Sequence, residues 1–249
     1  VRGLSKHFGG ISALSEITFS IPRGSIISMI GPNGAGKSTF INVVSGIHVP
    51  DGGEVFFQEK IITGLPAHVI AAKGIGRTFQ LLELFGSLSV LENVMVGCHT
   101  RSHSGMLACG FSLLSAVKEE KRIREEAIEN ITLVGLAGKA HDPISRLPLG
   151  ERKLVGIARA LAMKPKLLML DEPAGGLAAH EVDGLARLIH LLVERGLTLF
   201  IVEHNMPFVM ALSHRIIVLD GGMKIAEGPP DEVRRNEEVI KAYLGEEVY

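Results

Sequence analysis

The sequence predicts an α/β fold in which helices cover a parallel sheet. In the second half of the chain, apolar runs short enough for buried strands alternate with longer amphipathic stretches. The strands are expected at 167–170, 198–202 and 216–220, and the helices between them at 180–195 and 206–212. Such alternation is typical of a parallel sheet with helices on its faces. The 249 residues, 46% hydrophobic and 21% charged, suffice for one large domain with a subdomain.

The first 80 residues are expected to form short strands joined by turns. An apolar run at 25–30 has the length of a buried strand, and apolar residues at helical spacing follow at 40–47. Pro50-Asp51-Gly52-Gly53 predicts a turn, and a strand is expected at 55–57. A short helix at 66–73 and a short strand at 77–79 complete this part of the chain.

The character of the chain changes between residue 81 and about residue 146. The charged run at 118–126 continues into an apolar-faced stretch at 127–134, which predicts one long helix. We therefore expect this block to be a helical insert. A good amphipathic helix is predicted directly after it, at 151–163.

A phosphate-binding loop lies between the strand at 25–30 and the helix that follows it. The loop residues are Gly31, Pro32, Asn33, Gly34, Ala35, Gly36, Lys37, Ser38 and Thr39. Glycines remove Cβ atoms and permit positive φ, so that backbone N–H groups and the N-terminus of the next helix can face an anion. Lys37 is expected to reach the β- and γ-phosphates of a nucleotide, and the Ser38 hydroxyl to bind Mg²⁺. A glycine-rich turn without a ligand is disfavoured, because Lys-Ser-Thr stands at the offset that phosphate binding requires.

Two carboxylates end the apolar run at 167–170. In α/β proteins, ligands bind at the carboxyl ends of parallel strands, where Asp171 and Glu172 are expected to lie. Asp171 would hold Mg²⁺, directly or through water, and Glu172 would polarise a water for attack on the γ-phosphate. The alternative, an acidic helix cap, is disfavoured by the phosphate loop upstream.

Two further polar residues follow predicted strands. His204 comes after the strand at 198–202 and is expected to contact the γ-phosphate and the attacking water. Gln80 comes after the strand at 77–79 and is expected to reach Mg²⁺ or water. Neither residue alone would indicate chemistry, because single polar residues at strand ends are usually structural, but their order along the chain supports a hydrolysis site.

Charge and hydropathy narrow the classes of partner. The formal net charge is −1, which argues against nucleic-acid binding driven by bulk charge. The most apolar long stretch, 197–219, is interrupted by charged residues and a proline, so no transmembrane helix is predicted. We therefore expect a soluble protein, or one that is held at a membrane by a partner.

These residues, in this order, resemble the ATP-binding subunit of an ABC (ATP-binding cassette) transporter over nearly the whole chain. Residues 31–39 match the Walker A motif, 167–172 the Walker B motif with its catalytic glutamate, Gln80 the Q-loop and His204 the switch histidine. The resemblance implies a P-loop NTPase (RecA-like) core at about 1–80 and 155–249. It also implies an N-terminal antiparallel β-subdomain, and a helical subdomain at about 81–154. Phe8 stands where the family places an aromatic ring that stacks on adenine, although a core role is the alternative.

The chain departs from the family pattern at two segments. The signature, typically Leu-Ser-Gly-Gly-Gln, is Leu147-Pro148-Leu149-Gly150-Glu151 here. Proline offers neither a hydroxyl nor an N–H, so a contact with the γ-phosphate of an opposite subunit has to rest on Gly150 and the N-terminus of the next helix. In the D-loop, Ala178 replaces the usual aspartate, which predicts weaker communication between the two sites.

The form of the signature is similar to that of subunits for branched-chain amino acid import. Residues 75–80, the long insert and the ending at 226–245 point the same way. The resemblance implies ATP and Mg²⁺ as ligands, and a second ATP-binding subunit, identical or homologous, in a head-to-tail dimer. It also implies two membrane permeases, indirect work with an extracytoplasmic solute-binding protein, and a peripheral location on the cytoplasmic face of the inner membrane. No nucleic-acid partner is implied.

The same resemblance implies a docking surface for the permease at 81–94, including Phe85. The alternative is that these apolar residues only pack the insert. Two other functions stay open at this level. An export-type ATPase of the lipopolysaccharide kind usually keeps Ser-Gly-Gly in the signature, and a soluble ABC ATPase without a transport role usually carries two cassettes.

Overall fold

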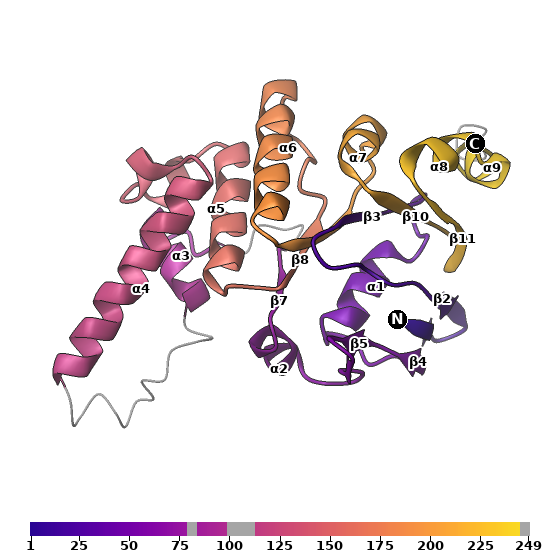
Figure 1. The fold of residues 1–249 in the computed structure, drawn as a ribbon, viewed down its shortest axis with the longest axis horizontal. Helices are drawn as coiled ribbons and strands as arrows, with labels where there is room; N and C mark the ends of the chain where they lie inside the picture. Colours follow the sequence, from indigo (N-terminus) through magenta and orange to yellow (C-terminus); the bar gives the residue numbers. More distant parts are fainter. Residues whose placement is uncertain (79–83, 99–112, 245–249) are drawn as a thin grey trace.

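The structure is a computed structural model that describes residues 1–78, 84–98 and 113–244. A six-stranded sheet forms the centre of the molecule, with helices on both faces (Figure 1). A group of helices forms one end of the molecule, and the C-terminal helices form the other end. None of the helices within the described ranges is both long and apolar enough to cross a bilayer.

The central sheet is parallel except at one edge. In spatial order its strands are β11 (Met223–Gly228), β10 (Arg215–Asp220), β3 (Ile26–Ile30), β9 (Thr198–Val202), β8 (Leu167–Asp171) and β7 (Ile75–Arg77). Only β11 runs antiparallel to its neighbour. Every residue of β3, β8 and β9 is buried, as expected for strands that helices cover on both faces.

Alternation along β3 divides the apolar core between the two faces of the sheet. Ile27 and Met29 pack on the face covered by α1 (Lys37–Val44), whereas Ile26 packs with the helices of the opposite face. On the α1 side, the ring centroids of Phe40 and Phe200 lie 5.4 Å apart. On the other side lie α6 (Ala179–Glu194) and α7 (Met206–Leu212), visible above the sheet in Figure 1. The helix that follows the phosphate loop is therefore anchored to the sheet by apolar burial.

Two small antiparallel sheets lie beside α1. One has the order β2–β1–β4, with β1 at Arg2–Phe8, β2 at Ile11–Ile17 and β4 at Gly52–Glu54. The other is the hairpin of β5 (Phe56–Phe57) and β6 (Lys60–Ile61). Leu4, Leu14 and Ile17 join the core on the α1 side, so the antiparallel β region packs directly on the central sheet.

The remaining helices lie at the two ends of the molecule and at its base (Figure 1). The group at one end consists of α3 (Val90–Cys98), α4 (Leu113–Leu133) and α5 (Leu149–Ala162), with two 3-10 turns at Ala137–Lys139 and Ile144–Arg146. Residues such as Val94, Ile131 and Val155 form its core. Beside β7 lies α2 (Ala67–Ala72), and the chain ends in α8 (Pro230–Arg235) and α9 (Glu237–Leu244).

The predicted α/β fold with its parallel sheet is confirmed, and several details differ. Strand β7 occupies Ile75–Arg77, two residues earlier than expected, because the pairing with Leu167–Met169 decides its register. The expected strand at 55–57 is present only as β5, at Phe56–Phe57, and the predicted turn at 50–53 already contains the start of β4. Strand β11 and helices α8 and α9 were not predicted from residue patterns.

Candidate functional site

The sheet register brings the ends of three neighbouring strands to one edge. Met29 of β3 pairs with Val202 of β9, and Val202 pairs with Asp171 of β8. All three strands run in the same direction, so the next residues along each chain lie beyond the same edge. The phosphate loop, Glu172 and His204 therefore begin side by side, although 32 residues separate Glu172 from His204 and more than 130 separate either of them from the loop. This is the edge at which α/β proteins bind ligands.

The phosphate loop is held by its glycines and by two neighbouring strands. Gly31, Gly34 and Gly36 have φ angles of 151°, 78° and 100°. A Cβ on Gly31 would collide with the carbonyl oxygen of Leu219 in β10. One on Gly36 would collide with the carbonyl oxygen of Ala13 in β2. The loop thus needs glycine at two positions for close packing, and at Gly34, where nothing lies within 4 Å of an added Cβ, only for its backbone conformation.

The tip of the loop is open to solvent, and its base is buried. Asn33, Gly34 and Ser38 are exposed, Gly36 and Thr39 are half-buried, and Gly31, Pro32, Ala35 and Lys37 are buried. No side chain caps the N-terminus of α1, whose N-cap is Gly36. Backbone N–H groups of the first turn of a helix have no partner within that helix, and the helix dipole is positive there. The loop therefore has the form of an anion site.

Lys37 lies over this loop. Its ammonium donates hydrogen bonds to the carbonyl oxygens of Gly31 and Pro32, at 2.5 and 2.8 Å. The residue is only 9% exposed, so the charge lies within the site rather than in bulk solvent. A buried cation beside a helix N-terminus gives the loop a strong preference for negative charge.

Asp171 is a buried carboxylate at the end of β8. Its Oδ2 accepts a hydrogen bond from the Arg77 guanidinium at 3.1 Å, whereas its Oδ1 has no hydrogen-bond partner although it is buried. Burial raises the pKa of Asp171, and the charges of Glu172 and Glu203 add to this, while Arg77 opposes it. Arg77 also donates to Asn42 and Ser45 of the α1 region, at 2.7 and 3.0 Å, so it ties the phosphate-loop helix to the carboxylate.

The geometry of this carboxylate fits Mg²⁺. An unpartnered buried oxygen next to a phosphate site is costly unless a cation or a proton satisfies it. Mg²⁺ is commonly held by one or two carboxylates together with substrate phosphates and waters. Within the described residues, no cluster of three or more His, Cys, Asp or Glu could hold a metal by itself. The Asp171 carboxylate and the Ser38 hydroxyl are thus the protein groups suited to such an ion.

Glu172 directly follows Asp171 and has an unusual backbone conformation, with φ at +46°. Non-glycine residues at positive φ carry a strain on the order of 1 kcal/mol. Among the contacts that hold this conformation, the Glu172 N–H donates to the Val202 carbonyl at 2.9 Å, and Lys153 donates to the Glu172 carbonyl at 2.8 Å. The side chain is 25% exposed, so its carboxylate is accessible.

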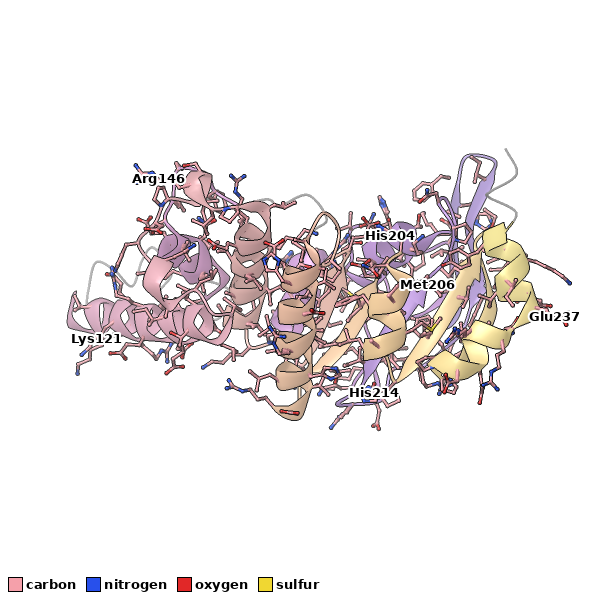
Figure 2. The ribbon with its side chains drawn as sticks, turned by 90° about the horizontal axis from the view of Figure 1, so that it is seen from above. Lys121, Arg146, His204, Met206, His214 and Glu237 are labelled. Atoms are coloured by element: carbon pink, nitrogen blue, oxygen red, sulfur yellow. The ribbon has the colours of Figure 1, made fainter. Side chains whose placement is uncertain are left out.

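His204 faces Glu172 across the strand ends. Its Nδ1 lies 3.8 Å from Oε1 of Glu172, and its side chain is 61% exposed. Figure 2 shows His204 and His214 at opposite ends of α7, so His204 is the one at the edge that carries the site. A base and a second polar group in this arrangement can orient one water between them.

Lys153, on α5, approaches the Glu172 segment from the helical group. Its ammonium donates to the carbonyl oxygens of Glu172 and Pro173 at 2.8 and 3.2 Å. Burial lowers the pKa of Lys153, and the charges of Glu203 and Glu172 oppose that effect. Glu203 itself is fully buried and accepts hydrogen bonds from three backbone N–H groups.

The other predicted residues lie outside this cluster. Gly150 is in the first turn of α5, which lies beyond β7 and β8 from α1 in Figure 1. Its Cα lies against the Glu181 carboxylate, and Pro148 serves as the N-cap of α5. Phe8 ends β1, is 43% exposed, and packs edge-on against His48 with ring centroids 5.3 Å apart. Gln80 lies outside the described residues.

Arg77, Lys153 and Glu203 were not expected at this site from the sequence. Arg77 is the last residue of β7, in a segment that was interpreted only as a short strand and as a point of resemblance to a family. Glu203 stands between a buried strand and His204, a position where a fully buried carboxylate needs strong partners. The position of Glu203 in the sequence could therefore have indicated that it belongs to the site. Lys153 carried no signal, because a lysine on an amphipathic helix is usually solvated.

Comparisons with known protein families identify related sequences. Residues 14–175 match the family model described as ABC transporter. Residues 223–249 match the model described as branched-chain amino acid ATP-binding cassette transporter.

Two curated relatives cover nearly the full length. The chain is 39% identical to the high-affinity branched-chain amino acid transport ATP-binding protein BraF of Pseudomonas aeruginosa, over 99% of this chain and 97% of that protein. It is 38% identical to the corresponding protein LivG of Escherichia coli K12, with the same coverage.

Solved structures of ATP-binding cassettes have the same fold. A nucleotide-free cassette from an ABC transporter superimposes with a TM-score of 0.86 at 30% identity, covering 97% of this chain and 96% of that one. The ADP conformation of the cassette MJ1267 gives 0.84 at 32% identity, with 98% and 97% covered. The dimeric cassette MJ0796 gives 0.79 at 27% identity, with 92% and 97% covered.

Replacing Gly36 by alanine tests the packing of the phosphate loop. The new Cβ would meet the Ala13 carbonyl at a φ of 100°, so we expect Gly36→Ala to lower the free energy of unfolding by about 2–4 kcal/mol. Gly34→Ala is the matched control, because its φ of 78° brings strain of only about 1 kcal/mol and no collision. Equilibrium urea unfolding without nucleotide measures both. Equal losses in the two variants would show that contact with β2 does not fix the loop.

Proposed function

The chain belongs to the ABC transporter family of ATP-binding cassettes, and on that premise we propose that it is the ATP-hydrolysing subunit of an importer for branched-chain amino acids. The observation that carries the proposal is the register of β3, β9 and β8, which brings the phosphate loop, His204 and Glu172 to one edge. The choice of solute is supported by relatives of this transport class that are 38–39% identical over nearly the full length of both proteins.

In this proposal the phosphate loop binds the triphosphate of ATP. Backbone N–H groups of residues 31–39 and the N-terminus of α1 face the phosphate oxygens, and Lys37 exchanges its two carbonyl partners for the β- and γ-phosphates. Phe8 stacks on the adenine with its exposed face. Gln80 assists at the metal or the water.

Asp171 and Ser38 would hold Mg²⁺, with Gln80 as a further ligand. The unpartnered Oδ1 of Asp171 supports this role, since a divalent cation would satisfy it and favour the ionised carboxylate. Bound Mg²⁺ would neutralise part of the negative charge on the β- and γ-phosphates. Arg77 keeps the Asp171 carboxylate beside α1 through its hydrogen bonds to both.

Glu172 acts as the general base. It accepts a proton from a water whose oxygen attacks the γ-phosphorus, while the bond from that phosphorus to the β–γ bridging oxygen breaks and ADP leaves. His204 orients this water and contacts the γ-phosphate, which its 3.8 Å separation from Glu172 permits. Both side chains are partly exposed, so a water and the γ-phosphate can reach them from the solvent side.

A second ATP-binding subunit, identical or homologous, completes each site in a head-to-tail dimer. Gly150 and the N-terminus of α5 would contact the γ-phosphate bound to the opposite subunit. Glu181, whose carboxylate lies against Gly150, has to yield for that contact to form. The known dimeric cassette MJ0796 is a precedent for pairing in this family.

The remaining partners follow from the transport role. Two membrane permeases would pass the solute that an extracytoplasmic binding protein delivers, and this subunit would lie on the cytoplasmic face of the inner membrane. We divide the chain into a nucleotide-binding core at about 1–80 and 155–249 and a helical subdomain at about 81–154. The described part of the permease-docking segment, 84–94, begins in a loop and continues into α3.

Phe85 is the proposed anchor of the permease. It is 51% exposed, although hydrogen bonds connect the loop that carries it to α3. The buried amide of Asn93 accepts from the Phe85 N–H at 2.9 Å and donates to the carbonyl of Phe85 at 3.1 Å. A hydrogen-bonded loop that presents an exposed aromatic ring suits a protein partner.

Glu172→Gln tests the catalytic role. The amide cannot accept the proton from water, so we expect turnover to fall by at least about 100-fold while ATP affinity changes by less than about threefold. Phosphate release and equilibrium ATP binding measure the two effects. Glu194→Gln, at the far end of α6, is the control for loss of a carboxylate alone. Turnover at the wild-type rate in Glu172→Gln would remove Glu172 from this role.

Phe85→Glu tests the docking surface. Burying a carboxylate in the contact would be costly, so we expect the variant to lose co-purification with the permeases and solute uptake. ATP affinity of the isolated chain should stay within about twofold, because Phe85 does not contact the phosphate loop. Asn93 remains to hold the loop, and Val117→Glu, an exposed apolar site on α4, is the matched control. Normal assembly and uptake would place the docking surface elsewhere.

A further inference from the structure

A buried carboxylate lies between the two segments that carry the hydrolysis residues. Glu203 directly follows β9 and has no solvent exposure. Its Oε1 accepts a hydrogen bond from the Ala174 N–H at 2.7 Å. Its Oε2 accepts from the N–H groups of His204 and Asn205, at 2.9 and 3.2 Å. The two oxygens therefore bind two different segments of the chain.

These two segments separate just beyond the end of the sheet. The last main-chain hydrogen bond between them, within the described parts of the chain, runs from the Glu172 N–H to the Val202 carbonyl. Beyond it, the segment after β8 turns toward α6 and the segment after β9 enters α7. The Glu203 side chain continues the connection where the backbone pairing stops.

The hydrogen bonds of Glu203 are strong enough to hold the two segments together. Hydrogen bonds from N–H groups to a carboxylate are roughly twice as strong as neutral ones, and three of them offset much of the cost of burying the charge. Lys153 adds electrostatic attraction to Glu203 while it binds the carbonyls of Glu172 and Pro173. The Glu172 segment is thus held by Lys153 through its carbonyls and by Glu203 through the Ala174 N–H.

We propose that Glu203 is a positioning residue for ATP hydrolysis, which holds the Glu172 segment against the His204 segment and so sets the distance between these two side chains. The inference rests on the proposed function of Glu172 and His204. Glu203 is buried beneath the site, and its hydrogen bonds run to the main chain of its neighbours, while its charge, which also acts on Asp171, is kept in an aspartate variant. It therefore affects the geometry of water attack and leaves the phosphate loop unchanged.

This role predicts a specific kinetic pattern. A displacement of a catalytic group by about 1 Å can cost up to about 100-fold in rate. Loss of the link should therefore lower kcat while KM for ATP stays nearly constant, since a KM rise would indicate lost binding. A merely structural role would lower the unfolding temperature without lowering kcat of the folded protein.

The test compares Glu203→Gln and Glu203→Asp in the transporter complex purified through a tag on this chain. Glutamine keeps the size but must turn an NH₂ group toward a backbone N–H, so at least one of the two segments loses its bond. Aspartate keeps the charge but is one methylene shorter and cannot reach both segments. For each variant, kcat, KM for ATP and the thermal unfolding midpoint are measured. Turnover that remains in Glu172→Gln is subtracted as background.

We expect both variants to lose about 10- to 100-fold in kcat, with KM for ATP within about threefold of wild type. Glu227→Gln is the control, because Glu227 is also a largely buried carboxylate with two partners, Arg215 at 2.9 Å and Lys224 at 2.6 Å, but on β11, at the edge of the sheet away from β8 and β9. Its kcat should equal that of wild type. If Glu203→Gln does not fold, the aspartate variant alone decides.

Three results would overturn the inference. The first is an unchanged kcat in both variants. The second is full activity in Glu203→Asp, which would leave Glu203 only a role through its charge. The third is a rise in KM for ATP that accounts for the whole loss of kcat/KM. A wild-type complex whose turnover does not exceed the Glu172→Gln background would instead remove the proposed function, and this inference with it. Failure of the two proposals is therefore distinguishable.

Discussion

The parallel pairing of β3, β9 and β8 is the constraint on which the site depends. In a parallel sheet all strands end at the same edge, so the register that aligns Met29, Val202 and Asp171 also aligns whatever follows them. Apolar burial on both faces fixes that register, since the three strands are buried throughout. The core therefore sets the positions of the side chains that follow these strands, and a shift of one residue in any strand would move Glu172 and His204 relative to the phosphate loop.

Beyond the strand ends, buried charged side chains connect the neighbouring segments, where backbone hydrogen bonds no longer do so. Arg77 connects Asp171 to Asn42 and Ser45, so the carboxylate and the phosphate-loop helix form one unit. Glu203 and Lys153 do the same for the segment that carries Glu172. These charges are costly to bury, and each is offset by hydrogen bonds to backbone or to an opposite charge. Lys153 lies on α5, in the helical group, so a movement of α5 relative to the sheet would displace the main chain at Glu172.

Local residue patterns predicted the strands and helices of the core well, because the spacing of apolar residues in each segment fitted either a strand or a helix and not both. They failed where tertiary pairing decides the outcome: β7 begins earlier than its residues suggest, since β8 fixes its register. That the phosphate loop, Asp171, Glu172 and His204 lie at one edge of the sheet could be predicted, because fixed spacing marks the loop and the other three follow or end apolar strands. Arg77, Lys153 and Glu203 could not, because a charged residue with a buried partner looks in sequence like one in solvent.

We infer that the phosphate loop and the Asp171 carboxylate together bind one Mg²⁺–ATP. Calorimetric titration of ATP with and without Mg²⁺, into wild type and Asp171→Asn, measures this joint binding. Mg²⁺ should strengthen ATP binding to the wild type, and the gain should be smaller by about tenfold or more in the variant, a loss of about 1.4 kcal/mol. An equal gain from Mg²⁺ in both proteins would show that the carboxylate lies outside the nucleotide site.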